Sequence, residues 1–421
     1  MVSERLRRVG QYQLYPSFAA GGMATIHLGR QLGPLGPGRI VAIKRLQEAS
    51  AHNADFRRMF LDEARITSRL EHPHVVRTLD VVSTETELLI VMELVRGDAL
   101  SSLLRRCKST DTRIPLPILS AIVVGALDGL HAAHEAVDSD GAPLQVVHRD
   151  VSPHNILVGT DGIARIADFG IAKALGRAHA TRSGELKGKL AFMAPEQIRG
   201  AAVDRRADVY GVAVVLWEAC TGSRLFAGDE ANVMFQVLED APPPPSQLRP
   251  EIPAPLEQLI LQGLQKDASK RLATAFEMAR ALEAAVPPAR PHEVGAWVRE
   301  VGRENLEKQS ALIRAAESAD RAESTQRADS THRAETASRS ERAASPGAEE
   351  RTGPSSSGVD SRTTVDISPV RQRRRPRHAR VWAVLAGGAA LAAACGAGGR
   401  VMEGSFSSRI IAQRPPAGRR C

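Results

Sequence analysis

Two short stretches of the chain carry carboxylate and amide side chains at close spacing. HRDVSPHN occupies residues 148–155, and DFG follows at residues 168–170. Carboxylates can accept protons, and carboxylate and amide oxygens are of the kind that Mg²⁺ prefers as ligands. These residue types are the ones that proton transfer beside a bound cation would need.

These two motifs belong to a longer series. VAIK ends at Lys44, Glu63 follows within a predicted helix, and APE occupies residues 194–196. In this order and spacing the series resembles the eukaryotic-like (Hanks-type) serine/threonine protein kinases of bacteria, over residues 12–285. The resemblance implies transfer of the γ-phosphoryl group of ATP to Ser or Thr of protein substrates, with Mg²⁺ or Mn²⁺ as the metal.

The resemblance implies a role for each of these residues. Asp150 orients the attacking hydroxyl and accepts its proton, while Asn155 and Asp168 hold the metal. Lys44 contacts the α- and β-phosphates, and Glu63 holds the Lys44 ammonium in place. Without Glu63 nineteen residues later, Lys44 would be interpreted as an ordinary lysine at the end of a strand.

The resemblance also implies a nucleotide site. It predicts Ile26, Ala42 and Leu157 as adenine-facing walls, Met92 as gatekeeper, Glu93 and Val95 as backbone partners of the adenine edge, and Asp98 as the ribose contact. For the apolar members, packing in the core is nearly as good an interpretation, because pocket walls and core are chemically alike.

The loop expected over the phosphates departs from the three-glycine pattern of the family. It reads Ala19-Ala20-Gly21-Gly22-Met23-Ala24. Gly21 matches the second motif glycine, and Ala19 and Ala24 replace the other two. Glycine lets backbone amides approach phosphate, and alanine is its smallest substitute, so we expect a looser or less mobile lid and not an inactive site.

A second departure involves two positions together. The family has Lys two residues after the catalytic Asp and Thr at the start of the segment before APE; here these positions are Ser152 and Lys189. Because those side chains touch in the family, our hypothesis is that Lys189 supplies the cation for the γ-phosphate and Ser152 the hydroxyl near Asp150. The alternative is two neutral changes that leave a weak or inactive enzyme.

Other matches to the family are structural or regulatory. Glu196 and Arg271 match a buried ion pair that ties the activation segment to the C-lobe, and Asp208 matches an acid that braces the HRD backbone. Arg149 suggests control by phosphorylation of the activation loop, since it would meet the new phosphate. The candidate acceptors are Thr181 and Ser183; the alternative is that both are solvated loop hydroxyls.

The fold class predicted is α+β, with the bilobal protein kinase fold. The N-lobe is expected over residues 12–95, because 41–46 and 88–94 have strand composition and apolar residues recur at helical spacing between them. Helical patterns dominate residues 96–285, the expected C-lobe. No zinc site or disulfide framework is expected, because the four cysteines are scattered.

The positive charge is confined to the end of the chain. The net charge is +8, but residues 371–421 contain eleven Arg and one acid, a charge of +10, which leaves about −2 for the first 370 residues. Nucleic acid is therefore not an expected partner of the globular part, and the Arg run itself fits a membrane flank better than a nucleic-acid patch.

The last part of the chain is predicted to be a tether. Residues 290–370 are rich in Arg, Glu and Ser and are expected to form a disordered linker, followed by a basic juxtamembrane run at 371–380. Residues 381–399 contain no charge and could span a bilayer, with a short basic tail at 400–421. The expected location is the inner membrane with the kinase domain in the cytoplasm; the alternative is a cytoplasmic protein with a disordered Ala/Gly tail.

Three other functions remain as alternatives at this stage. A tyrosine kinase is disfavoured by the catalytic loop, and a small-molecule phosphotransferase by the APE segment with its partner Arg271. A pseudokinase or phospho-docking scaffold would bind nucleotide with little turnover. Self-association for autophosphorylation is a further expected interaction.

Overall fold

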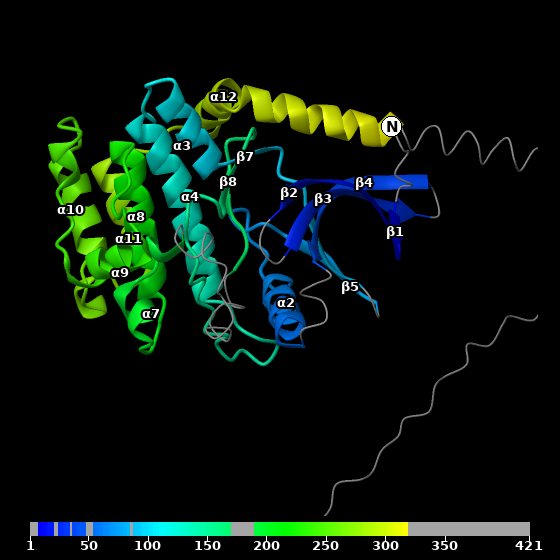
Figure 1. Ribbon diagram of the computed structural model, residues 1–421, viewed down its shortest axis with the longest axis horizontal. Coiled ribbons are helices and arrows are strands. Elements are labelled where there is room, and N and C mark those ends of the chain that lie inside the picture. Colours follow the sequence, from blue (N-terminus) through cyan, green and yellow to red (C-terminus); the bar gives the residue numbers. More distant parts are fainter. Residues whose placement is uncertain are drawn as a thin grey trace, which may run out of the picture. The chain divides into compact units, whose positions relative to one another are not determined.

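The computed structural model describes residues 7–20, 24–33, 36–47, 54–84, 87–169 and 189–318 (Figure 1). The predicted bilobal fold is confirmed: a β-rich lobe precedes a helical lobe. Gly21–Met23 of the phosphate loop, Thr181 and Ser183, and all segments after residue 318 lie outside the described residues. The predictions for those parts therefore stay predictions.

Within the described residues, the N-lobe is one antiparallel sheet with the strand order β1-β2-β3-β4-β6-β5. The strands are β1 (Arg7–Val9), β2 (Tyr12–Ala20), β3 (Ala24–Gly33), β4 (Gly36–Leu46), β5 (Thr78–Ser83) and β6 (Leu88–Glu93). Side chains alternate between the faces of a strand. Val41 and Ile43 are buried with Tyr12 and Val91 on one face, so Lys44 is directed to the other.

Helix α2 (Ala54–Thr67) packs on that other face. Phe60 and Ala64, one helical turn apart, are buried in a cluster with Leu46, Leu88 and Ile90. This confirms the helix predicted between the two strand patterns. Because the packing fixes the rotation of α2 about its axis, it also brings Glu63 toward the strand that carries Lys44.

The C-lobe is helical apart from a small sheet of three strands in the order β7-β8-β9. Its elements are β7 (Gly97–Ala99), α3 (Leu100–Ser109), α4 (Leu116–His134), β8 (Ile156–Gly159), β9 (Ala164–Ile166), α7 (Pro195–Arg199), α8 (Arg206–Thr221), α9 (Glu230–Glu239), η1 (Pro245–Gln247), α10 (Ala254–Gly263), η2 (Ala268–Lys270) and α11 (Ala275–Ala285). Helices α4 and α8 run through the centre of its hydrophobic core. Of the helices in the described part of the chain, α4 alone is long and apolar enough to cross a membrane, but two thirds of it is buried in this core.

The prediction of a disordered linker from residue 290 was wrong for its first part. Helix α12 (Pro291–Val301) is followed by a second helix at 303–318. Val294 and Val298 are one turn apart and buried, and a Cβ on Gly295 would lie 2.5 Å from the Thr160 carbonyl oxygen, so the glycine permits close docking. This apolar stripe is short and directly precedes the polar residues 304–350, so composition did not reveal it; it folds because the kinase domain buries it.

Candidate active site

Lys44 on β4 lies between two carboxylates that come from different lobes. Its Nζ is 2.7 Å from Glu63 Oε1 on α2 and 3.0 Å from Asp168 Oδ1. Burial by itself would lower the pKa of Lys44, but the charges of Asp168 and Glu63 outweigh it and raise that pKa above its usual value. The ammonium therefore stays charged, and the ion pair expected from the spacing of Lys44 and Glu63 is present.

The backbone of the HRD segment is held by a buried carboxylate on α8. Asp208 Oδ2 accepts the His148 N–H and Oδ1 accepts the Arg149 N–H, both at 2.8 Å. His134 Nε2 on α4 lies 2.7 Å from the same Oδ2, a contact that sequence reasoning missed. Although burial works in the opposite direction, these hydrogen bonds and nearby imidazoles hold the pKa of Asp208 below its usual value.

Two residues of this region adopt left-handed backbone conformations. Arg149 has φ 65° and Asp168 has φ 56°, which costs energy for residues with a Cβ. The hydrogen bonds that Asp208 accepts from the backbone stabilise the conformation of Arg149. The conformation of Asp168 is stabilised by its neighbour Phe169, which is 1% exposed and lies 4.7 Å, centroid to centroid, from the ring of His148. The surrounding packing thus overcomes local strain in order to present Asp168.

Asp150 and Asn155 are joined directly. Asn155 Nδ2 donates to the Asp150 carbonyl oxygen at 2.8 Å and to Asp150 Oδ2 at 3.1 Å. With its amide nitrogen occupied in this way, Asn155 presents its amide oxygen as a ligand for a cation. Asp150 is half-buried and retains access to solvent.

Asn155 and Asp168 fit a metal ion whose other ligands are not protein groups. Among the described residues there is no cluster of three or more His, Cys, Asp or Glu side chains that could form a closed cation site. With Asn155 and Asp168 as its protein ligands, Mg²⁺ would be completed by phosphate oxygens and water, because this cation dehydrates reluctantly. Such an ion supplies positive charge where phosphate charge develops.

The residues predicted to bind the nucleotide come from elements of both lobes. Ala42, Met92 and Ile26 lie on β4, β6 and β3, and Leu157 lies on β8. Val95 follows β6, and within the described residues its N–H makes no hydrogen bond. A backbone donor without a protein partner could serve the edge of an adenine ring, as the resemblance predicts for Val95.

Of the exchanged pair, Ser152 lies in the catalytic loop and Lys189 begins the described range 189–318. Ser152 is 7% exposed, and Lys189 is half-buried. Burial is the largest cause of the lowered pKa of His154, but the charge of Lys189 also lowers this pKa while that of Asp150 raises it. Both charges thus act on one imidazole, which is compatible with the proposed pairing. The hypothesis that Lys189 reaches the γ-phosphate remains a prediction.

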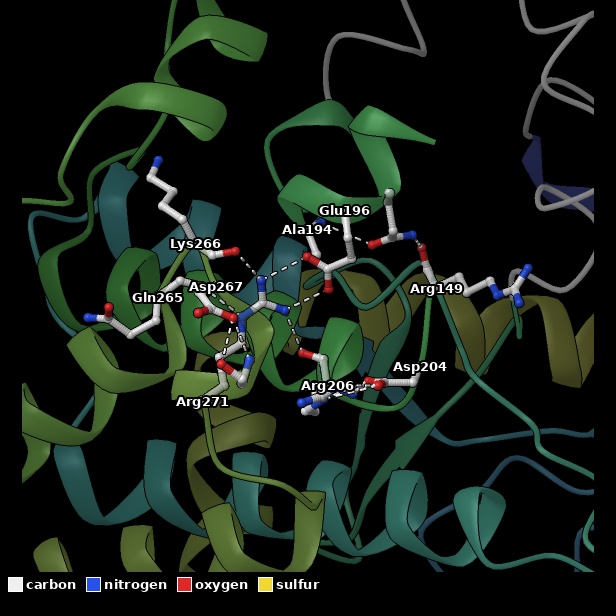
Figure 2. Close-up of polar contacts among 11 residues, drawn as sticks. Arg149, Ala194, Glu196, Asp204, Arg206, Gln265, Lys266, Asp267 and Arg271 are labelled. Atoms are coloured by element: carbon white, nitrogen blue, oxygen red, sulfur yellow. Dashed lines mark hydrogen bonds and ion pairs between the residues drawn. The ribbon is translucent and has the colours of Figure 1, made fainter. Parts of the chain in front are cut away.

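Arg271 ties the APE segment to the C-lobe (Figure 2). Its two terminal nitrogens donate to the two oxygens of Glu196 at 2.7 and 2.8 Å, and the same guanidinium donates to the carbonyl oxygens of Gln265, Arg206 and Lys266. The Arg271 side chain is 0% exposed. The predicted ion pair is therefore present, and it is bidentate.

Gln197, directly after APE, was not singled out from the sequence. Its Nε2 donates to the Arg149 carbonyl oxygen and its Oε1 accepts the Ala194 N–H, both at 3.0 Å. It thereby connects the catalytic loop to the start of α7. Neither Gln197 nor His134 carries a motif signal, because each acts through a contact that only the fold creates.

Comparison with known proteins agrees with this geometry. The protein kinase domain model matches residues 21–283, and the chain therefore belongs to the protein kinase domain family. The sequence is 41% identical over 279 residues to tyrosine-protein kinase MasK of Myxococcus xanthus, covering 66% of this chain and 43% of MasK. It is 36% identical over 280 residues to serine/threonine-protein kinase PknE of Mycobacterium bovis, covering 66% and 47%.

A longer match and a solved structure extend the comparison. Serine/threonine-protein kinase PrkC of Bacillus subtilis is 31% identical over 314 residues, covering 74% of this chain and 46% of PrkC. The chain thus spans less than half the length of the curated relatives it matches. The crystal structure of the PknI kinase domain of Mycobacterium tuberculosis superposes with a TM-score of 0.51 at 25% identity, covering 66% of this chain and 98% of that domain.

Proposed function

We propose that this chain is a protein kinase that transfers the γ-phosphoryl group of ATP to Ser or Thr of proteins. The observations that carry the proposal are the position of Lys44 between Glu63 and Asp168 and the hydrogen bond that joins Asn155 to Asp150. In protein kinases, phosphoryl transfer needs the Lys–Glu ion pair and the DFG aspartate in place together.

Each residue has one task in this proposal. Asp150 accepts the proton of the substrate hydroxyl and orients its oxygen. Asn155 and Asp168 hold Mg²⁺ or Mn²⁺, and Lys44 binds the non-transferred phosphates. Lys189 supplies the cation for the γ-phosphate in place of the usual lysine, and Ser152 supplies the hydroxyl that the family has on Thr.

Serine and threonine are the proposed acceptors, with tyrosine as the second candidate. PknE and PrkC are named serine/threonine-protein kinases, and the catalytic loop HRDVSPHN lacks the arrangement typical of tyrosine kinases. MasK, however, is named a tyrosine-protein kinase and is 41% identical. Phosphoamino-acid analysis of the product distinguishes the two.

We also propose control by autophosphorylation on Thr181 or Ser183, through self-association of two copies. Within the described residues, the Arg149 guanidinium makes no hydrogen bond or ion pair, so it is suited to receive a phosphate on the activation segment. The membrane span proposed at residues 381–399 would keep two copies close together and the kinase domain in the cytoplasm.

Incubation of the full chain with radiolabelled ATP and Mg²⁺ tests the function. We expect incorporation on Ser or Thr by the wild type and a loss of at least about 100-fold in Asp150→Asn, because the proton acceptor is removed. Lys189→Ala should lower kcat by about 10- to 100-fold, as expected when an interaction with the transferring group is lost.

Two results of this experiment would contradict the proposal. Nucleotide binding without incorporation in the wild type would indicate a pseudokinase or docking scaffold. An unchanged kcat in Lys189→Ala would show that Lys189 does not replace the missing lysine, while leaving the kinase function itself intact.

A further inference from the structure

The helix at 303–318 lies beyond the family match, which ends at residue 283. It continues from α12 along the side of the molecule where β7 and the N-lobe sheet meet (Figure 1). We call it the hinge helix. Its contacts involve both lobes and the segment that joins them.

Both ends of the hinge helix are anchored. Near its C-terminal end, Ile313 and Ala316 are buried in one cluster with Tyr15 and Leu28 of the N-lobe sheet, and Leu94 packs against this cluster. At its first turn, Glu304 pairs with Arg106 of α3 at 3.2 Å. A helix fixed to both lobes in this way has a defined position beside the nucleotide site.

Between these anchors the hinge helix contacts two groups assigned to the nucleotide. Asn305 Nδ2 donates to Asp98 Oδ2 at 2.6 Å, and Gln309 Nε2 donates to the Val95 carbonyl oxygen at 3.3 Å. Asp98 Oδ1 accepts the Ala99 N–H at 2.9 Å. Each oxygen of the Asp98 carboxylate therefore has one protein donor, and each keeps one further lone pair.

We propose that Asn305 is a positioning residue that fixes the Asp98 carboxylate for the ribose hydroxyls of the nucleotide. This inference rests on the proposed function. A carboxylate held from both oxygens loses little conformational freedom when a ribose binds, so the contact is stronger than one made by a mobile side chain. The amide is neutral and leaves the charge of Asp98 intact, which keeps the hydrogen bond to a hydroxyl charge-assisted.

Gln309 has a parallel effect at the adenine edge. By donating to the Val95 carbonyl oxygen, it fixes the peptide group at this position, and the Val95 N–H remains for the base. The two helix residues thus act on different parts of the nucleotide, Asn305 on the sugar and Gln309 on the base. This division allows their effects to be separated experimentally.

The experiment measures equilibrium binding by calorimetry with the full chain and Mg²⁺, and it uses ADP and 2′,3′-dideoxy-ADP so that no turnover occurs. We expect the wild type to bind ADP about tenfold more tightly than the dideoxy analogue, since a charge-assisted hydrogen bond contributes at least about 1.4 kcal/mol. In Asn305→Ala this preference should fall to about threefold or less, with the affinity for dideoxy-ADP unchanged.

Two further variants keep the result interpretable. Gln309→Ala should weaken both ligands by a similar factor and retain the preference for ADP. Glu307→Ala, an exposed position on the same helix without a hydrogen bond or ion pair among the described residues, should behave as the wild type. Thermal melting of each variant checks that the fold is retained.

Three outcomes would overturn the inference. If Asn305→Ala kept the wild-type preference for ADP over the dideoxy analogue, Asn305 would only stabilise the position of the helix. Tighter ADP binding in that variant would mean that the helix competes with nucleotide. A wild type without ribose preference would remove Asp98 from the site. If the wild type bound neither ligand, the proposed function would fail as well, so the two failures are distinguishable.

Discussion

Buried charged side chains in this molecule are stabilised by specific hydrogen-bond partners. The kind of partner decides which substitutions at these positions retain stability. Lys44, Asp208 and Arg271 each have two or more hydrogen-bond partners. Glu218 on α8 differs from these residues, because its environment disfavours its charged form. Burial raises its pKa to about 7, although the Leu225 N–H and the Arg224 charge act in the opposite direction.

This pKa predicts a pH-dependent gain from Glu218→Gln. The folded-state pKa lies above the unfolded value of 4.5, so the wild type loses stability as the pH rises from 4.5 through 7, where the folded form must ionise. Gln stays neutral and can still accept the Leu225 N–H. We expect the variant's advantage in unfolding free energy to grow between pH 5 and pH 7.5 and then level off.

Urea denaturation at several pH values measures this gain. Glu300→Gln, at an exposed position of α12, serves as the control and should show no such trend. If the difference in unfolding free energy between Glu218→Gln and the wild type stayed constant across this pH range, the pKa of Glu218 would not be raised by folding.

At the scale of elements, short segments are held in place by single polar residues. Helix α7 spans only Pro195–Arg199, too short to be stable by its own hydrogen bonds. Its position depends on the pair between Glu196 and Arg271 and on the bridge that Gln197 makes to the catalytic loop. The activation segment therefore ends at a point that the C-lobe core determines.

Arg271→Lys tests this dependence. Lysine cannot pair with both oxygens of Glu196 and also donate to three carbonyl groups, and it loses the contact with the Tyr210 ring. We expect the unfolding free energy to fall by about 3 kcal/mol. Arg280→Lys, where the arginine side chain is 47% exposed, should change it by less than about 0.5 kcal/mol. Equal effects in the two variants would contradict the assignment.

At the scale of the whole described body, the compact part extends to residue 318 and not to 285 as predicted. The hinge helix buries Ala316 to 1% exposure against the N-lobe. Truncation near residue 300 would remove this contact. It would also remove Asn305 and Gln309, whose side chains contact Asp98 and Val95. Experiments on nucleotide binding therefore need the longer chain.

Ala316→Asp is expected to release the end of the hinge helix, because a carboxylate without a partner is costly to bury. Hydrogen exchange of residues 303–318 should accelerate by at least about tenfold, while exchange in α8 stays unchanged. Ala315→Asp places the same charge at the exposed neighbouring position and should leave exchange unaffected. Similar rates in both variants would show that the helix is not docked at this end.

From the sequence by itself, the order and spacing of the motifs led to the kinase resemblance, which implied the fold class and the candidate site residues. Local spacing predicted the strand and helix around Lys44 and Glu63, since alternation in a strand and a 3.6-residue period in a helix are set by the backbone. Tertiary structure alone decided the contacts of His134, Gln197, Asn305 and Gln309. Their partners are 48 to 214 residues away in the chain, and no local pattern encodes a contact that exists only after two distant surfaces have packed together.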